Sequence, residues 1–482
     1  MKQVIPLIAF FLIILLFFAG CKKEYSCENA CNISNQAPAP GFLNKPPVAR
    51  AGSDTSILLP GEILLNGSTS FDPDNNINLY KWTKIAGPLL FSIVNQDAVK
   101  TMVTGLVKGI YLFELKVTDS TGLFSKDTIQ VTVNDLSCDV SMRPFTNARL
   151  TPIGTFSRKR ENIAIAAAGN KILFAGGIIA GVVSATVDIY DIVNQTWSVA
   201  ALSVPRHDMA VAIAGNKIFF GGGYNGNDLK PATYATVDMY DVASNTWSVT
   251  QMGTSAGGRS AAVVNNKVFF AGGYHSNGMP GGVDLPATTD IYDVQTGAWS
   301  AAVLSAGRLS ISAVAANNNV YFAGGLTAGN TGTAVIDIYN GGTGKWSRRS
   351  LLEPAGNMAG IAVGDKIYWA GGHTEPPGRS LNRVEIMDTK TNSIATDCLF
   401  QRNEVFAAVM KNNRLVFFTG NSALTGAKNK FDIYDIGSNS WSIGLLFDGI
   451  QGASVISVNN TIYVAGGYVL GSLTNQLWKL EF

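Results

Sequence analysis

The sequence is poor in charged residues, histidines and cysteines. Only 15% of its 482 residues are charged, and a net charge of +2 gives no electrostatic reason to expect a nucleic-acid partner. The 3 histidines, His207, His275 and His373, have no spacing that identifies a metal site. Neither a Ser nucleophile elbow nor a phosphate-binding glycine loop is evident. The sequence therefore identifies no catalytic residue.

The first residues form a segment with a separate role. Met1-Lys2 is followed by an almost unbroken apolar run from Val4 to Phe18, which is short for a membrane span. This pattern predicts a secretory signal over residues 1–20. Phe18-Ala19-Gly20-Cys21 resembles the bacterial lipobox, although Phe18 replaces the usual Leu. The resemblance implies cleavage before Cys21 and diacylation of that cysteine, and the alternative is an uncleaved anchor helix.

This signal predicts an exported protein that is attached to a bacterial membrane only through the lipid on Cys21. We expect the outer membrane, and the sequence leaves open whether the protein faces the periplasm or the cell surface. Residues 21–45, rich in Asn, Ala and Pro, are expected to be a tether. The remaining cysteines can pair in an oxidising compartment, but their connectivity is not fixed by the sequence: Cys27, Cys31, Cys138 and Cys398.

Glycine, by contrast, is abundant, with 51 residues, and this composition suits an all-β protein with many tight turns. Residues 46–135 alternate short β-type runs with turn signals, which predicts a β-sandwich. The motifs Leu65–Asp74, Tyr80–Trp82 and Val117–Gly122 resemble those of the PKD (polycystic kidney disease) domain. The resemblance implies that Trp82 fills the space between the two sheets. It also makes Asp72 and Asp74 candidate calcium ligands, against the alternative of a purely structural turn.

From Arg158 onward the sequence repeats with a period of roughly 44 to 52 residues. A double glycine recurs six times, with a degenerate copy at Gly420-Asn421. A Tyr then stands seven residues before a Trp in five repeats, and Met387 and Ile394 replace this pair in another: Tyr190/Trp197, Tyr240/Trp247, Tyr292/Trp299, Tyr339/Trp346 and Tyr434/Trp441. This pattern resembles the Kelch repeat. It predicts a β-propeller over residues 145–482 in which the aromatic residues fill the wedges between blades.

The propeller is predicted to have seven blades, with six as the alternative. The last repeat offers only three strands before the chain stops, so another segment must supply the fourth. Residues 149–154, just before the first repeat, are placed where an outer strand would lie. We therefore expect the start of the propeller to complete its last blade.

Two sets of residues are candidates for ligand binding. The loops after the double glycines are long and irregular, which is where recognition is expected, although such residues can also be merely solvated: Tyr224, Tyr274, His275, His373 and Tyr468. The second set lies where the inner strands begin: Arg160, Arg206, Arg259, Arg308 and Arg402. In Kelch propellers that bind acidic peptides, arginines at this place line the mouth of the central channel. They would bind carboxylates there, or else only bridge blades.

Other repeats carry Ala355 and Ile450 at the position of these arginines. The sequence therefore predicts that replacing Arg206 and Arg308 by Ala leaves folding little changed. The function expected from these features is that of an exported binding or adhesion protein with a protein or glycan ligand, anionic if the arginines bind it. The alternative is a carbohydrate-active enzyme similar to sialic acid mutarotases or galactose-oxidase-type enzymes. No cofactor is expected apart from calcium in the PKD-like domain.

Overall fold

The computed structural model describes residues 44–58, 62–107, 109–134, 140–226, 232–276, 283–374, 379–401, 405–419, 429–446 and 449–482. The chain divides into two compact units, residues 1–135 and 136–482. All regular elements in the described part are β-strands, in accord with the all-β prediction. No helix long and apolar enough to cross a membrane occurs among these residues. The predicted signal, the predicted lipidation site Cys21 and Arg402 lie outside the described residues.

The first unit is a sandwich of two sheets. One contains β1 (Thr55–Leu58), β7 (Phe124–Asn134), β6 (Gly109–Asp119) and β3 (Ile77–Ala86) in that order, and the other contains β2 (Ile63–Asn66), β5 (Lys100–Thr104) and β4 (Ser92–Ile93). Alternate residues of β6, from Tyr111 to Val117, are fully buried, as expected for a strand with one face on a core. Trp82 is also fully buried in this core, as predicted.

The second unit contains five separate four-stranded antiparallel sheets in its described residues. Their strands are, sheet by sheet, β9 (Ala164–Ala168), β10 (Lys171–Ala175), β13 (Thr186–Asp191) and β14 (Thr196–Ala201); β15 (Ala210–Ala214), β16 (Lys217–Gly221), β17 (Thr236–Asp241) and β18 (Thr246–Gln251); β19 (Ser260–Val264), β20 (Lys267–Ala271), β23 (Thr288–Asp293) and β24 (Trp299–Val303); β25 (Ser312–Ala316), β26 (Asn319–Ala323), β27 (Val335–Asn340) and β28 (Trp346–Ser350); and β29 (Ala359–Val363), β30 (Lys366–Ala370), β33 (Arg383–Asp388) and β34 (Ile394–Cys398).

A further sheet of eight strands joins the two ends of the propeller sequence. Its order is β35 (Val405–Lys411), β36 (Arg414–Thr419), β37 (Lys430–Asp435), β38 (Ser440–Leu446), β8 (Phe145–Thr155), β44 (Gln476–Glu481), β41 (Thr461–Ala465) and β40 (Ser454–Val458). Strand β8 pairs antiparallel with β44, from Arg149 opposite Glu481 to Thr155 opposite Gln476. This confirms the predicted fourth strand. The start of β8 also pairs in parallel with β38, so one strand fastens two neighbouring sheets.

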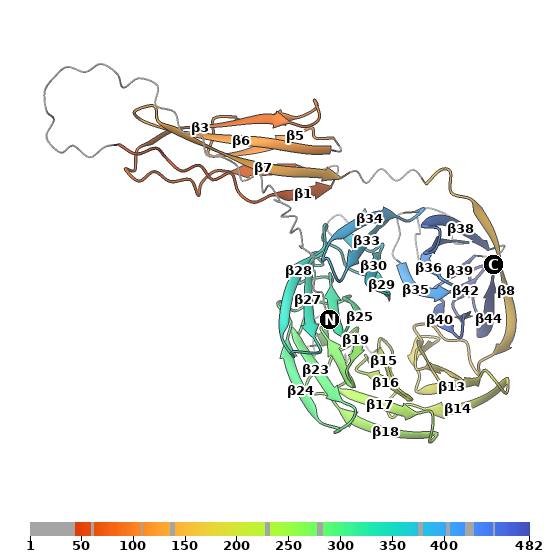
Figure 1. The fold of residues 1–482 in the computed structure, drawn as a ribbon. Helices are drawn as coiled ribbons and strands as arrows, with labels where there is room; N and C mark the ends of the chain where they lie inside the picture. Colours follow the sequence, from red (N-terminus) through yellow and green to blue (C-terminus); the bar gives the residue numbers. More distant parts are fainter. Residues whose placement is uncertain are drawn as a thin grey trace, which may run out of the picture. The chain divides into compact units, whose positions relative to one another are not determined.

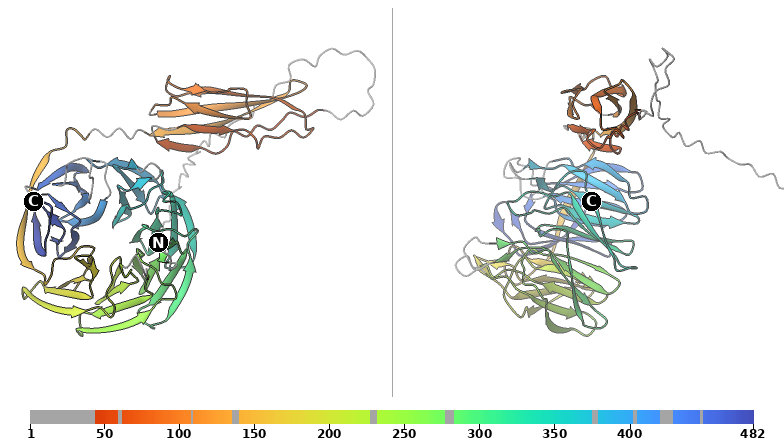
Figure 2. Two further views of the ribbon diagram at one scale, coloured as in Figure 1. Left: turned by 180° about the vertical axis from the view of Figure 1, so that it is seen from behind. Right: turned by 90° about the vertical axis from the view of Figure 1, so that its left-hand side faces the viewer.

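We number the repeats 1 to 7 after their innermost strands β9, β15, β19, β25, β29, β35 and β40. Each of these strands contacts the next one, and β40 contacts β9. The sheets accordingly lie in a ring around an axis (Figure 1), and the view from behind shows the same circle (Figure 2). These contacts favour seven blades over six.

The double glycines allow neighbouring repeats to approach closely. A Cβ on Gly176, whose φ is 65°, would lie 2.3 Å from the carbonyl oxygen of Arg206 in the next repeat. The aromatic residues fill the wedges between repeats, as predicted: Tyr240 is 1% exposed in a core that it shares with side chains of repeat 1. Its neighbour Trp247 is half-buried at the margin of that core.

Candidate ligand-binding site

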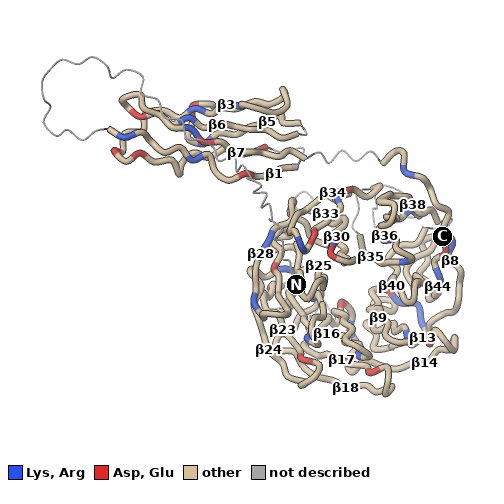
Figure 3. The backbone as a smooth tube through the Cα atoms, viewed as in Figure 1, with Lys and Arg blue, Asp and Glu red and all other residues tan. Residues whose placement is uncertain are grey.

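The arginines near the starts of the inner strands are buried and are not exposed at a channel mouth. Arg160, Arg206 and Arg308 are 0% exposed, and Arg259 is 6% exposed. Because a buried guanidinium cannot meet a ligand, the ligand-binding interpretation of these four residues is wrong. Charged residues are in general thinly scattered over the strands of the propeller (Figure 3).

Each of these arginines pairs with an aspartate on the third strand of its own repeat. The distance from Arg206 Nη2 to Asp238 Oδ2 is 2.6 Å, and the corresponding pairs are Arg160–Asp188, Arg259–Asp290 and Arg308–Asp337. The same carboxylate accepts hydrogen bonds from the segment that connects successive repeats, as in Ser203 N to Asp238 Oδ1 at 2.9 Å. The pair therefore fastens the connecting segment to the repeat that follows it.

Burial lowers the pKa of all four guanidinium groups, and the neighbouring aspartate charge raises it again in part. Arginine nevertheless stays protonated in proteins, so these are charged pairs in the interior. In repeat 3 the usual arginine position is occupied by Ala256, and Arg259 lies three residues later in the chain. Its Nη1 still lies 2.6 Å from Asp290 Oδ2, so the ion pair forms although the arginine occupies a different position in the repeat.

The loops after the double glycines return to the start of the innermost strand of the same repeat. Isolated β-bridges make this connection, for example His207 with Tyr224 and Gly257 with Tyr274. In repeat 7 the same connection is the pairing of β39 (Ile450–Gln451) with β42 (Tyr468–Val469). The predicted loop residues and the starts of the inner strands therefore lie at one end of the ring, which we call the loop end.

Four side chains of repeats 2 and 3 meet at the loop end. The rings of Tyr224 and Tyr274 lie edge to face with centroids 6.0 Å apart, and the imidazole of His207 lies 5.5 Å from the ring of Tyr224. The hydroxyl of Tyr274 donates a hydrogen bond of 2.9 Å to Asp208 Oδ2. His207 Nδ1 is 3.1 Å from Asp208 Oδ1. We call His207, Asp208, Tyr224 and Tyr274 the loop-end cluster.

The pKa shifts at the cluster favour a charged Asp208 carboxylate and a neutral Tyr274 phenol. Desolvation raises the pKa of Asp208, but the neighbouring His207 imidazole and Tyr274 hydroxyl outweigh it, so that this pKa lies below its usual value. Burial and the charge of Asp208 raise the pKa of Tyr274. The phenol therefore stays the donor in this hydrogen bond, and the Asp208 side chain, 38% exposed, keeps lone pairs for a ligand.

Asp208 belongs to a series of residues with left-handed backbone conformation at the loop end. The residue two places after the usual arginine position has a φ between 53° and 64° in six repeats: Asn162, Asp208, Gly258, Ser310, Asn357 and Gly452. Asn, Asp and Gly adopt this conformation at little cost, whereas Ser does so less readily. Sequence reasoning missed this series, although small polar residues recurring at one place in each repeat are a signal that could have revealed it.

The other predicted loop residues have different surroundings. His275 adjoins the cluster in sequence, and its Nδ1 lies 3.0 Å from the hydroxyl and 3.0 Å from the carbonyl oxygen of Ser255. His373, in repeat 5, has its Nδ1 3.4 Å from Asn357 Nδ2. The hydroxyl of Tyr468, in repeat 7, donates to Glu161 Oε2 at 2.6 Å. The candidates are thus spread over the loop end, and only two of them, Tyr224 and Tyr274, belong to the cluster.

In the sandwich, Asp72 and Asp74 form a hydrogen-bonded turn. Asp72 Oδ1 accepts from Asp74 N at 2.7 Å, and Asp74 Oδ2 accepts from Lys45 N at 2.6 Å. Within the described ranges, no three His, Cys, Asp or Glu side chains are grouped as metal ligands. These contacts support a structural turn, and calcium binding stays a prediction.

Comparisons with known proteins agree with the fold. A family model described as a PKD domain matches residues 51–133, and the Kelch motif matches residues 205–250 and 354–393. The chain thus contains a PKD domain and a Kelch β-propeller, a combination that fits a protein-binding or adhesion role.

Two similar proteins match part of this chain. The human Dyslexia-associated protein KIAA0319 is 43% identical over 91 residues, which are 19% of this chain and 8% of that protein. The mouse Low-density lipoprotein receptor-related protein 11 is 35% identical over 113 residues, or 23% of each chain. The match therefore spans less than a quarter of these relatives. A solved structure described as "Structure of YjhT" is 14% identical, with a TM-score of 0.43, over 67% of this chain and 94% of that one.

Proposed function

We propose that the protein is an exported, lipid-anchored binding or adhesion protein that recognises a protein partner through the loop end of its propeller. The observation that carries the proposal is the loop-end cluster, in which a charged carboxylate and two tyrosine rings are held together. Loops on a rigid scaffold are a usual place for recognition. The cluster is built where the loops of repeats 2 and 3 meet.

The chemistry of the cluster favours a basic side chain of the partner. Asp208 supplies a negative charge, and tyrosine rings attract cations to their faces. The arginines that would have favoured an anionic ligand are buried and paired. We therefore expect the loop end to prefer a Lys or Arg side chain, in place of the anionic ligand that the sequence suggested.

Export and lipid anchoring rest on the signal segment and on Cys21. The disulfide bond of Cys398 supports export, because such bonds persist in oxidising compartments. Labelled fatty acid should be incorporated into the wild-type protein and not into Cys21→Ala. Incorporation into this variant would contradict the lipid anchor.

Binding can be tested with the full-length protein in detergent and an array of peptides and glycans. We expect basic peptides to bind, and their affinity to fall as salt is added. Asp208→Asn should weaken binding by about tenfold or more, since a hydrogen bond to a charged group contributes about 1.5–3 kcal/mol. Glu161→Gln is the matched control, because Glu161 also accepts from a tyrosine at the loop end but lies outside the cluster.

Equal losses for the two variants would contradict a local site at the cluster. Binding of neutral glycans without basic peptides would contradict a protein partner. Turnover of a sugar in the same assay would favour the enzyme alternative.

A further inference from the structure

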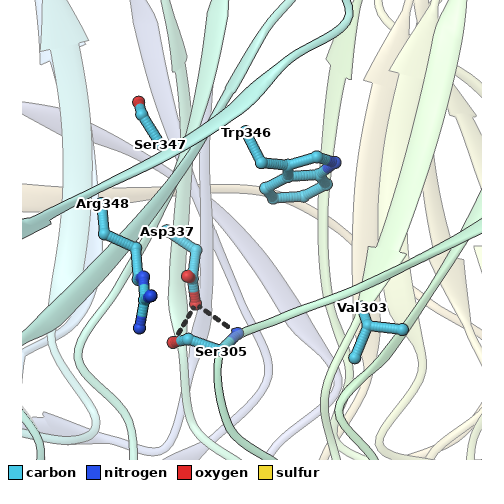
Figure 4. A pocket seen from close by; sticks show the side chains of 6 residues that line it. All are labelled: Val303, Ser305, Asp337, Trp346, Ser347 and Arg348. Atoms are coloured by element: carbon cyan, nitrogen blue, oxygen red, sulfur yellow. Dashed lines mark hydrogen bonds between the residues drawn. The ribbon is translucent and has the colours of Figure 1, made fainter.

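The outer part of repeat 4 contains a pocket that the proposed function does not use. It has a volume of ≈ 380 Å³ and lies between the outermost strand β24 of repeat 3 and strands β27 and β28 of repeat 4. Its lining is Val303, Ser305, Asp337, Trp346, Ser347 and Arg348 (Figure 4). Trp346 and the 71% exposed Val303 supply its apolar surface, and Asp337 lies beside Ser305.

The arginine of this pocket is not required by the fold. The position of Arg348, two residues after the recurring Trp, is occupied in other repeats by Val199, Val249, Ala301, Thr396 and Ile443. The backbone of Arg348 pairs with Asp337 in the sheet, but among the interactions of the described residues its side chain makes no ion pair or hydrogen bond. Asp337, opposite it on β27, is already engaged by Arg308 Nη2 at 2.5 Å and by the Ser305 hydroxyl at 3.0 Å. The exposed guanidinium of Arg348 is therefore available to a ligand.

The indole N–H of Trp346 is a second available donor. In repeats 3 and 6 the equivalent N–H groups donate to the preceding repeat, from Trp299 to Thr250 Oγ1 at 3.0 Å and from Trp441 to Asp397 Oδ2 at 2.6 Å. For Trp346 the residue at that place is Ala302, which has no acceptor in its side chain. For Trp247 in repeat 2 the equivalent residue of the preceding repeat is also an alanine, Ala200. In that repeat, however, Val249 stands at the position of Arg348. Among the repeats as the structure describes them, repeat 4 alone thus combines such an indole N–H with an arginine.

We propose that this pocket binds an aspartate or glutamate side chain of an acidic peptide in an extended conformation. A guanidinium can bind a carboxylate through two parallel hydrogen bonds, and the indole N–H can supply a third donor. The Trp346 ring and Val303 would contact the methylene groups of the same side chain. A pocket bounded by one arginine and one aromatic ring suits a single side chain.

The neighbouring backbone favours a peptide as the source of the carboxylate. Strand β28 is the last strand of its sheet and pairs only with β27, so its outer edge presents unpaired backbone groups. An extended peptide can add to such an edge while its alternate side chains enter adjacent pockets. Arg348 and Arg349 add positive charge beside this edge. The outer strands β14, β18 and β24 carry no charged residue, so edge protection by charge is not a general need of these repeats.

The proposal is tested with the full-length protein and a fluorescein-labelled peptide of alternating Glu and Val, by fluorescence polarisation. Arg348→Val should weaken binding at least tenfold and leave the melting temperature unchanged, because Val stands at this position in repeats 1 and 2. Arg349→Val removes the same charge from the same strand but does not line the pocket, and it should change affinity less than threefold. Asp208→Asn should leave binding of this peptide unchanged, so the result is independent of the loop end.

Unchanged binding by Arg348→Val, or equal losses in the two arginine variants, would overturn the proposal. A uronic-acid oligosaccharide is the second probe. If it binds through Arg348 and the peptide does not, the pocket recognises a carboxylate of a glycan and the peptide assignment is wrong.

Discussion

Repeats 1 to 4 and repeat 7 differ in the residues that occupy two corresponding positions, which are charged in the first four and apolar in repeat 7. In the first four, an arginine and an aspartate are buried together, with the arginine at the same position in repeats 1, 2 and 4 and three residues later in repeat 3. In repeat 7 these places hold Ile450 and Trp478, since Trp478 pairs with Val464 as Asp188 pairs with Phe174. The two charged residues are thus either both present or both replaced. This is expected because a single unpaired charge in the interior costs more free energy than an ion pair or an apolar pair at the same positions.

Repeats 5 and 6 keep the acid and take the cation from another part of the chain. Repeat 5 has Ala355 at the arginine position, and Arg383 from β33 pairs with Glu385 at 2.5 Å. In repeat 6, Arg143 from the segment before β8 lies 3.1 Å from Asp432 and covers the ring of Trp441 at 4.6 Å. A buried carboxylate is therefore common to these six repeats, whereas the arginine that pairs with it comes from different positions in the chain.

Breaking one pair should have the largest effect. Arg206→Ala leaves Asp238 buried without its cation, which typically costs about 3–5 kcal/mol in the free energy of unfolding. This reverses the expectation from the sequence that such a change leaves folding little altered. Denaturant unfolding monitored by fluorescence measures the loss.

The double variant Arg206→Met, Asp238→Leu sharpens this test, because it imitates the apolar solution of repeat 7. It should recover most of the stability that the single variant loses. A double variant as unstable as Arg206→Ala would contradict the view that the unpaired charge alone causes the loss, because Asp238→Leu also removes the hydrogen bonds from Ser203.

Much of the fold could be predicted because its signals are local. The double glycines and the Tyr–Trp spacing are tied to one strand–turn–strand unit, and the missing fourth strand of repeat 7 indicated the role of β8. The burial of the arginines could not be deduced from their spacing alone. An available signal was the acid two residues before each recurring Tyr, such as Asp188 before Tyr190, since an acid inside a buried strand requires a partner.

The candidate sites depend on contacts between repeats, which the sequence does not display. Tyr274 and Asp208 are 66 residues apart in the chain. The pocket at Arg348 is formed only when β24 and β28 lie next to each other. Residue identity suggested Tyr224 and Tyr274 as candidates, but their grouping with Asp208 follows from the ring.

Moving the cation within repeat 5 should have a smaller effect. Arg383→Thr introduces the residue found at this place in repeats 1 to 3 and should cost about 2–3 kcal/mol, through loss of hydrogen bonds to a charged group. The loss is reduced because burial raises the pKa of Glu385, which can then take up a proton. Adding Ala355→Arg restores the arrangement of repeats 1, 2 and 4 and should recover stability in a thermal melt. No recovery would contradict the equivalence of the two arginine positions.

Repeat 6 should show an effect of a different kind, a dependence of stability on pH. Burial raises the pKa of Asp432 to about 7 from its ordinary 3.8, because Arg143 offsets the cost of burying the charge only in part. Between these two values the folded protein holds a proton that the unfolded chain has released. The contribution of Asp432 is therefore fully present below about pH 4 and is lost as the pH rises through 7.

Asp432→Asn removes this dependence, so the stability of the wild type relative to the variant should fall from pH 4.5 to pH 8. Asp435 on the same strand is the matched control, because backbone hydrogen bonds from Ser438, with Arg414, lower its pKa. Its contribution is fully present above the unfolded pKa and is lost only as the pH falls below about 4, so the difference between the wild type and Asp435→Asn should stay constant from pH 4.5 to pH 8. Denaturant unfolding of the three proteins at several pH values measures both differences. A pH-independent difference between the wild type and Asp432→Asn would contradict the raised pKa. It would mean that Arg143, although it comes from outside repeat 6, fully offsets the cost of burying the charge of Asp432.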